Sequence, residues 1–156
     1  MGGDLPSPPN AVRAPSFLVS ALRDPGTPEV ATQPLQRIQI IKAWPGEGDL
    51  MHQAIFDVAG GENGASVDPF TCETQGPGAA ALCAVWTDPD FDPNRHAVYY
   101  ARVLENPSCR WSAIQCLQQD ESARSASCSD PSVAKTIQER LWTSPIWYEA
   151  PAESAG

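Results

Sequence analysis

Alternating apolar and polar residues predict several short β-strands in the first two thirds of the chain. In LQRIQIIKAW, residues 35–44, the side chains of Ile38, Ile40 and Trp44 fall on one face of an extended strand. Residues 51–59, MHQAIFDVA, alternate in the same way after the glycine-containing loop PGEGD. We therefore expect these two segments to form an antiparallel hairpin.

Four other segments have strand character. Residues 16–22 are almost continuously apolar, which is typical of a mostly buried strand. The segments 80–87 and 96–105 are rich in β-branched and aromatic residues, and they flank a corner with three aspartates. The closing segment 141–149 is also strand-like, although Pro145 restricts it to a sheet edge or a bulge.

Helical signals are few and fall in the last third of the chain. Residues 111–119 could form a short helix, and DPSVAKTIQER, residues 130–140, begins with Asp130 as a predicted N-cap and Pro131 at the first helical position. Sixteen prolines and eleven glycines among 156 residues interrupt regular structure often. The pattern thus predicts a mainly β fold: a small antiparallel sandwich-like sheet with one or two short helices and long loops.

The length of the chain is that of one domain. We expect a linker-like segment over residues 1–15, a single β-rich domain over 16–149 and a tail over 150–156. Ten basic against nineteen acidic residues give a net charge of −9, which disfavours nucleic acid and anionic membranes as partners. No stretch approaches the roughly 18 consecutive apolar residues of a membrane span, and the chain does not start like a signal peptide.

Five cysteines, none in a CxxC spacing, predict a disulfide framework rather than a zinc site. Buried free thiols are the alternative. The glycine-rich excursion that contains Cys72 needs a covalent tie, for which we predict a Cys72–Cys83 bridge. A second bridge is expected between two of Cys109, Cys116 and Cys128, which leaves one cysteine unpaired or with its partner missing. Such a framework belongs to an oxidising compartment.

The aspartates of WTDPDFDP form the one cluster that resembles a binding site. Asp88, Asp90 and Asp92 alternate as the first ligands of an EF-hand calcium loop do. The match then fails, because Pro93 stands where that loop needs glycine and Tyr99 stands where it needs glutamate. We interpret the corner as two Asp-Pro turns whose carboxylates accept backbone hydrogen bonds. A non-EF metal site at the three aspartates is the weaker alternative.

Other signs of catalysis are sparse. His52 and His96 are the sole histidines and lie on separate predicted strands, so we interpret them as surface or strand-face residues. The sequence contains no nucleophile elbow, HExxH, Walker loop or dinucleotide-binding glycine motif. We therefore predict no catalytic and no cofactor-binding residue in this chain. Four tryptophans lie in strand-like runs, where core packing is the first interpretation and a ligand groove the second: Trp44, Trp86, Trp142 and Trp147.

Four strings resemble the C-terminal part of the domain-of-unknown-function 3604 family: PLQRIQIIKAW, FDVA, AVWTDPDFDPNRHAVYYARVLENPSCRW and TIQERLWTSPIWY. The resemblance covers about residues 15–148. It implies a PHP-like, metallohydrolase-type domain upstream, with His and Asp ligands for a divalent metal, in an exported parent protein. It also implies that this chain is a fragment without that domain, and that it ends in the last strands of a small β-sandwich.

From the pattern and the resemblance together we expect a non-catalytic C-terminal β-rich module of a PHP-like metal-dependent hydrolase. Its partner would be the upstream domain of the same parent, which it would support structurally in the periplasm or outside the cell. One alternative is a secreted ligand-binding domain that uses exposed tryptophans. The other is a hydrolase that completes a site in trans or retains a metal at Asp88, Asp90 and Asp92.

Overall fold

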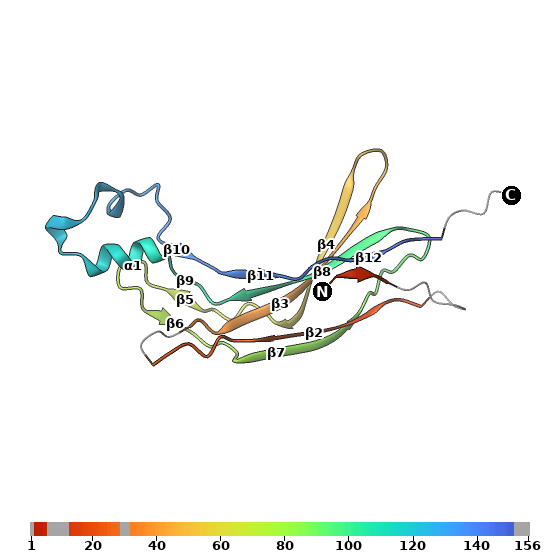
Figure 1. The fold of residues 1–156 in the computed structure, drawn as a ribbon, viewed down its shortest axis with the longest axis horizontal. Coiled ribbons are helices and arrows are strands. Elements are labelled where there is room, and N and C mark those ends of the chain that lie inside the picture. The colour runs from red at the N-terminus through yellow and green to blue at the C-terminus, as the bar shows by residue number, and fades with distance from the viewer. Residues whose placement is uncertain (1, 6–12, 29–31, 152–156) are drawn as a thin grey trace.

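The computed structural model describes residues 2–5, 13–28 and 32–151, and most regular structure in this part of the chain is β (Figure 1). The largest sheet contains β1 (Gly3–Asp4), β3 (Leu35–Pro45), β4 (Met51–Gly60), β8 (Ala97–Glu105), β11 (Arg140–Trp142) and β12 (Ile146–Tyr148). Its strand order is β1-β12-β8-β3-β4, and β11 also pairs with β8. The predicted mainly β fold is confirmed.

Three small sheets accompany this main sheet within the described residues. They pair β2 (Ser16–Leu22) with β7 (Ala81–Thr87), β5 (Ser66–Val67) with β6 (Thr74–Gln75), and β9 (Ser108–Cys109) with β10 (Thr136–Ile137). All three pairs are antiparallel. No helix in the described part of the chain is long and apolar enough to cross a membrane.

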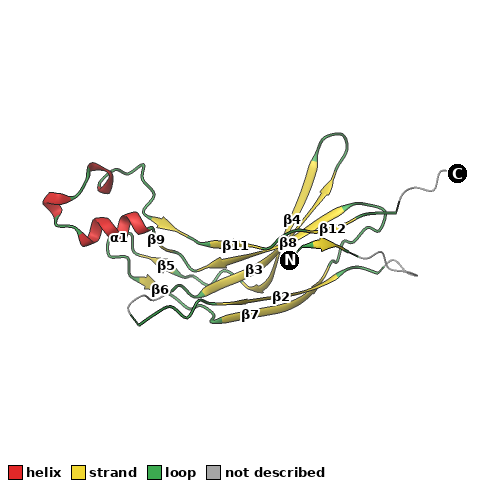
Figure 2. Cartoon of the chain, viewed as in Figure 1, coloured by secondary structure: helices red, strands yellow, loops and turns green. Residues whose placement is uncertain are grey.

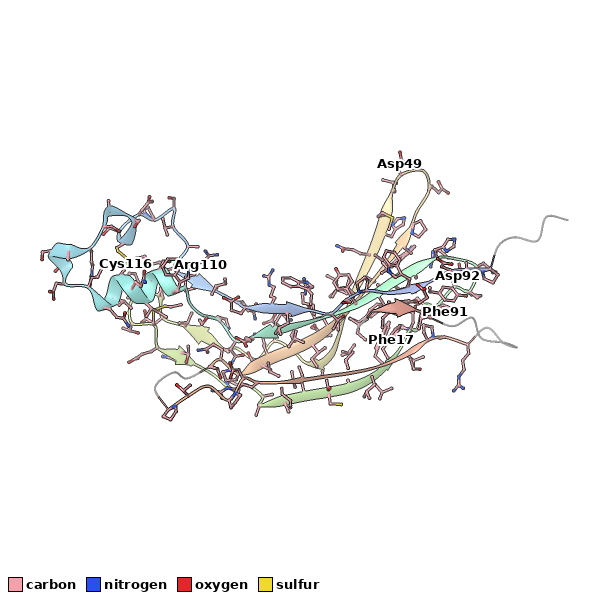
Figure 3. The ribbon with its side chains drawn as sticks, in the orientation of Figure 1. Phe17, Asp49, Phe91, Asp92, Arg110 and Cys116 are labelled. Carbon is pink, nitrogen blue, oxygen red and sulfur yellow. A yellow bond between two sulfur atoms is a disulfide. The ribbon has the colours of Figure 1, made fainter. Side chains whose placement is uncertain are left out.

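The β3–β4 hairpin confirms the strand pattern of the sequence. β3 pairs antiparallel with β4 on one side and with β8 on the other, so it is an interior strand of the main sheet. Ile38, Ile40 and Ile41 are therefore almost inaccessible to solvent. The hairpin tip, near Asp49, projects away from the rest of the fold (Figure 3).

The β2–β7 pair forms a second layer against one face of the main sheet. Phe17 of β2 lies between the layers (Figure 3), and its ring centroid is 4.8 Å from that of Tyr99 on β8. Trp86 of β7 approaches Phe56 of β4 at the same centroid distance. These aromatic contacts, together with Ile40, make the core of a two-layered sandwich.

The last strands and the first share one edge of the main sheet. Residues 143–145 separate β11 from β12, and both strands pair with β8. Pro145 falls in this break, where the sheet needs no N–H from it. β1, Gly3–Asp4, pairs parallel with β12, although these two residues fall within the predicted linker. Residues 6–12 of that linker and residues 152–156 of the predicted tail lie outside the described residues. The division into linker, domain and tail stays a prediction.

Residues 110–135, which we call the lobe, extend from one end of the sandwich and hold the helical segments (Figure 2). They are α1 (Trp111–Gln118) and the two short 3-10 turns η1 (Glu121–Ala123) and η2 (Ala126–Cys128). The short helix expected over 111–119 is present. Ala113 is the one buried residue that the structure describes within the lobe.

The helix predicted over residues 130–140 is wrong, because local and tertiary partners both compete with it. The Asp130 carboxylate accepts hydrogen bonds from the backbone N–H and the hydroxyl of Ser132, at 2.8 and 2.7 Å, which makes a tight turn. Thr136 and Ile137 then pair with β9. Gln138 Nε2 donates to the carbonyl of Glu105 at 2.9 Å, which fixes the chain in an extended form.

Candidate functional site

The aspartate corner between β7 and β8 is built from two turns that cap themselves. Asp88 Oδ1 accepts a hydrogen bond from the backbone N–H of Asp90 at 3.0 Å. Asp92 Oδ1 accepts one from the backbone N–H of Asn94, also at 3.0 Å. Figure 3 places Phe91 and Asp92 in this corner, at the end of the sandwich opposite the lobe. The interpretation of the corner as hydrogen-bonded Asp-Pro turns is confirmed.

The second carboxylate oxygen of Asp88 lies in the core and has two partners. Lys42 Nζ lies 2.5 Å from Asp88 Oδ2, and the hydroxyl of Tyr99 donates to the same oxygen at 2.7 Å. Only 3% of the Lys42 side chain and none of the Asp88 side chain is exposed. Such a desolvated ion pair persists because each charge neutralises the other and further hydrogen bonds satisfy both groups.

Lys42 is the member of this cluster that sequence reasoning missed. It lies two residues after Ile40 in β3, so its side chain leaves the strand on the core face. Its ammonium also donates to the carbonyl of Asp90 at 2.8 Å and lies 5.5 Å from the ring centroid of Trp44. A lysine at a core-facing strand position was the available signal, because a buried lysine requires a carboxylate partner.

Tyr99 completes the cluster as a hydrogen-bond donor. Burial, and after it the hydrogen bond to Asp88, raises the pKa of Tyr99 above its ordinary range. The phenol therefore stays protonated and the Asp88 carboxylate stays its acceptor. Asp88 and Lys42 are closed off from solvent, and their contacts join the corner to β3 and β8.

The metal alternative at the three aspartates stays a prediction. Asp88 is already neutralised by Lys42, and Asp92 lies 4.0 Å from Arg95. Asp88, Asp90 and Asp92 are thus brought together in one corner, but they do not converge on a common point. In the described residues, no group of three or more His, Cys, Asp or Glu side chains is placed to hold a metal ion.

The two histidines occupy separate structural positions. The ring of His52 stacks on Trp44 with 5.8 Å between centroids, across the β3–β4 ladder. His96 Nδ1 accepts a hydrogen bond from the backbone N–H of Ala150 at 3.2 Å. His52 thus lies on a strand of the sheet, and His96 lies at the surface of the corner just before β8, which agrees with their interpretation as surface or strand-face residues.

The disulfides correct one prediction. Cys72 is bonded to Cys109, and the predicted Cys72–Cys83 bridge is wrong. Cys83 lies in β7 opposite Ser20 of β2, with its side chain exposed on the outer face of the second layer, away from the excursion that holds Cys72. That excursion instead runs beside β9, where Cys109 lies.

The second bridge joins Cys116 to Cys128, which is one of the pairs in the expected set. It closes the lobe by linking α1 to η2. The framework therefore ties the glycine-rich excursion to the base of the lobe and then closes the lobe on itself. Two disulfides are compatible with an oxidising location outside the cytoplasm.

The outer face of the β2–β7 layer carries no charge and exposes large apolar side chains alongside hydroxyl groups. Neither strand contains a charged residue. Leu18 pairs with Val85 across the ladder, and these side chains are 74% and 72% exposed. Leu22 and Cys83 lie on the same face and are exposed as well. An uncharged apolar surface of this kind is typical of an interaction site.

Two tryptophans that were interpreted as core residues are exposed. Trp142 is 58% exposed and Trp147 is 51% exposed, so the core interpretation is wrong for both. They pair with Arg102 and Val98 of β8, which places them on the same face of the main sheet, opposite the second layer. Pattern alone could not separate the two faces, because both carry aromatic residues.

Comparison with known proteins gives a family and no closer relative. No curated protein and no solved structure matches the chain. The model of the family described as Protein of unknown function (DUF3604) matches residues 1–150, which is nearly the whole length. The matched part includes the aspartate corner, the second layer and both disulfides. The chain therefore belongs to the DUF3604 family.

Proposed function

We propose that this chain is a non-catalytic β-sandwich module that packs against and supports a PHP-like, metal-dependent hydrolase domain of the same parent protein. The observation that carries the proposal is the uncharged outer face of the β2–β7 layer. Leu18 and Val85 stand at its middle and are about three-quarters exposed. Covering them removes apolar surface from water without burying any charge, which favours a permanent interface.

The geometry of the aspartate corner supports a structural role for the chain. Its most buried carboxylate, Asp88, is neutralised by Lys42 and hydrogen-bonded by Tyr99, so it serves the fold. Under this proposal the divalent metal and its ligands belong to the upstream domain. The two disulfides support a periplasmic or extracellular location for the parent.

A paired substitution in the full-length parent tests the proposed interface. Leu18→Lys with Val85→Glu introduces two opposite charges directly across the ladder, so the module itself keeps its stability. Calorimetry of the wild-type parent should show one coupled unfolding transition, and the variant should show two, because the domains no longer stabilise each other.

The hairpin tip supplies a matched control. Leu50 and Met51 are 65% and 66% exposed, so Leu50→Lys with Met51→Glu changes the same amount of apolar surface away from the second layer. This control should unfold like the wild type. If the control and the Leu18/Val85 variant behave alike, the β2–β7 face is not the interface and the supporting role is lost.

A secreted ligand-binding domain is the second candidate, and the exposed tryptophans favour it. Trp142 and Trp147 pair with β8 residues four positions apart, so they stand about 13 Å apart on one sheet face. Such a spacing suits a flat, extended ligand such as a glycan chain, which stacks on aromatic rings. Tryptophan fluorescence titrations with a glycan panel test it, and binding that survives Trp142→Ala with Trp147→Ala would reject it.

A further inference from the structure

We propose that the second layer of the sandwich accepts one additional β-strand, supplied by an extended peptide segment, along the open edge of β2. In the described part of the chain, β2 pairs with β7 alone. Its other edge therefore presents unpaired backbone groups, which is the requirement for strand addition. The inference goes beyond the supporting role proposed above and does not rest on it. It concerns the open backbone edge of β2, whereas the supporting role concerns the outer face of the β2–β7 layer.

The hydrogen-bond pattern identifies the groups on this edge. Arg23 N–H donates to the carbonyl of Ala80, and Asp88 N–H donates to the carbonyl of Pro15, so the odd-numbered positions bond toward β7. Bonding alternates along an antiparallel ladder. The N–H and C=O groups of Leu18, Ser20 and Leu22 consequently point to the open edge, evenly spaced for an incoming strand.

A groove beneath this edge provides space for the side chains of such a strand. It has a volume of about 250 Å³ and lies between β2 and the β11–β12 break. Val19, Ile40 and Ile146 contribute apolar lining, and Thr143 and Ser144 line the groove as well. The groove exists because the second layer has two strands while the main sheet has five in a row. An added strand would cover part of the main sheet that the second layer leaves open.

The sequence of β2 lacks the usual protection of an exposed edge. Ser16–Leu22 contains no charge and no proline, and it runs through its full length in register with β7. Natural edge strands usually carry lysine, proline or a bulge that prevents pairing. Their absence from this regular edge is expected when a partner strand covers it.

A second copy of this chain does not fit as the occupant. Pairing through its own β2 would bring its main sheet into the space where β12 and β1 of the first copy lie, beyond β8. The slot thus suits a single strand without a layer of its own. We infer a peptide with apolar residues at alternate positions, facing the groove, because the lining of the groove is mainly apolar and the edge offers backbone groups alone.

A synthetic peptide with the sequence KTVTVTVTK is a suitable probe, and amide hydrogen exchange reads out its position. At saturation, the amides of Leu18, Ser20 and Leu22 should exchange at least about tenfold more slowly, because they become hydrogen-bonded. The amides of Phe17, Val19 and Ala21 should be unaffected, because β7 already holds them. The peptide KTVTPTVTK, whose central proline breaks the ladder, should protect none of the three.

Ser20→Pro tests the same edge by changing the protein and not the peptide. It removes an N–H that points away from β7, so the fold and melting temperature should be retained, while affinity for the probe falls by at least about tenfold. Ser20→Thr keeps the donor and should bind like the wild type. The proposal is overturned if the edge amides are already protected in the free protein, or if the probe protects no amide of β2.

Discussion

The sandwich and the lobe of the same chain are held together in different ways. The sandwich buries aromatic and aliphatic side chains between two layers, with Ile40 and Tyr99 at its centre. The lobe buries Ala113 alone among its described residues, and a disulfide between Cys116 and Cys128 closes it. Burial therefore stabilises one region and covalent closure the other, so each should fail under a different substitution.

Breaking the ion pair in the sandwich should have the largest effect. Lys42→Met leaves the Asp88 carboxylate buried without its cation, which should lower the free energy of unfolding by about 3–5 kcal/mol. Urea unfolding followed by near-UV circular dichroism measures the loss. Asp92→Asn, an exposed member of the same corner, serves as the control and should change stability far less.

A double variant separates the charge from the packing. Lys42→Met with Asp88→Asn removes both charges, while the amide oxygen of Asn can keep the hydrogen bond from the Asp90 N–H and its NH2 group can donate to the Tyr99 oxygen. Most of the lost stability should return. A double variant as unstable as Lys42→Met alone would mean that the loss came from the shape of the lysine side chain and not from an unpaired charge.

Removal of the lobe disulfide should have a smaller and local effect. Cys116→Ala with Cys128→Ala opens a loop with a sequence separation of 12, which costs about 3 kcal/mol in the chain-entropy model. With little buried surface to replace the bond, α1 should lose its hydrogen-exchange protection. The β3 and β8 amides should keep theirs. Equal loss of protection in both regions would show that lobe and sandwich unfold as one unit.

The same contrast explains how much of the fold could be predicted from sequence. The strands of the sandwich were predicted because alternation is a local property of segments such as 35–44 and 51–59. The pairing of Lys42 with Asp88 was missed because it joins β3 to the corner after β7, and nothing in either segment identifies the other. In the candidate site, the backbone caps of Asp88 and Asp92 were predictable, since each needs only the next two residues.

In and around the lobe, local signals were weaker than long-range partners. Asp130 and Pro131 are a good helix start, yet Thr136 and Ile137 pair with β9 and override it. The partner of Cys72 depends on the path of a glycine-rich excursion, which no pattern of side chains specifies. Disulfide connectivity is for this reason set by tertiary structure and not by spacing.

The smallest expected effect concerns the junction between the two regions, where Glu105 ends β8. Its backbone N–H donates to the carbonyl of Glu139 at 3.1 Å. Partial burial, and after it repulsion from the Glu139 carboxylate, raises the pKa of Glu105 above the ordinary 4.5. Since the folded state holds this proton more tightly than the unfolded state, the contribution to stability is present below pH 4.5 and is lost as pH rises through the folded pKa.

Glu105→Gln removes this titration and should therefore flatten the pH dependence. Relative to the wild type, the free energy of unfolding of the variant should rise more at pH 7 than at pH 4. The difference should be well under about 1.4 kcal/mol, because solvent screens the partly exposed group. Urea unfolding at both pH values and one ionic strength measures the difference. If the gain is equal at the two pH values, it comes from the new side-chain amide and not from the lost titration of Glu105. A gain confined to the higher pH would show that the partly buried charge of Glu105 destabilises the junction between the lobe and the sandwich.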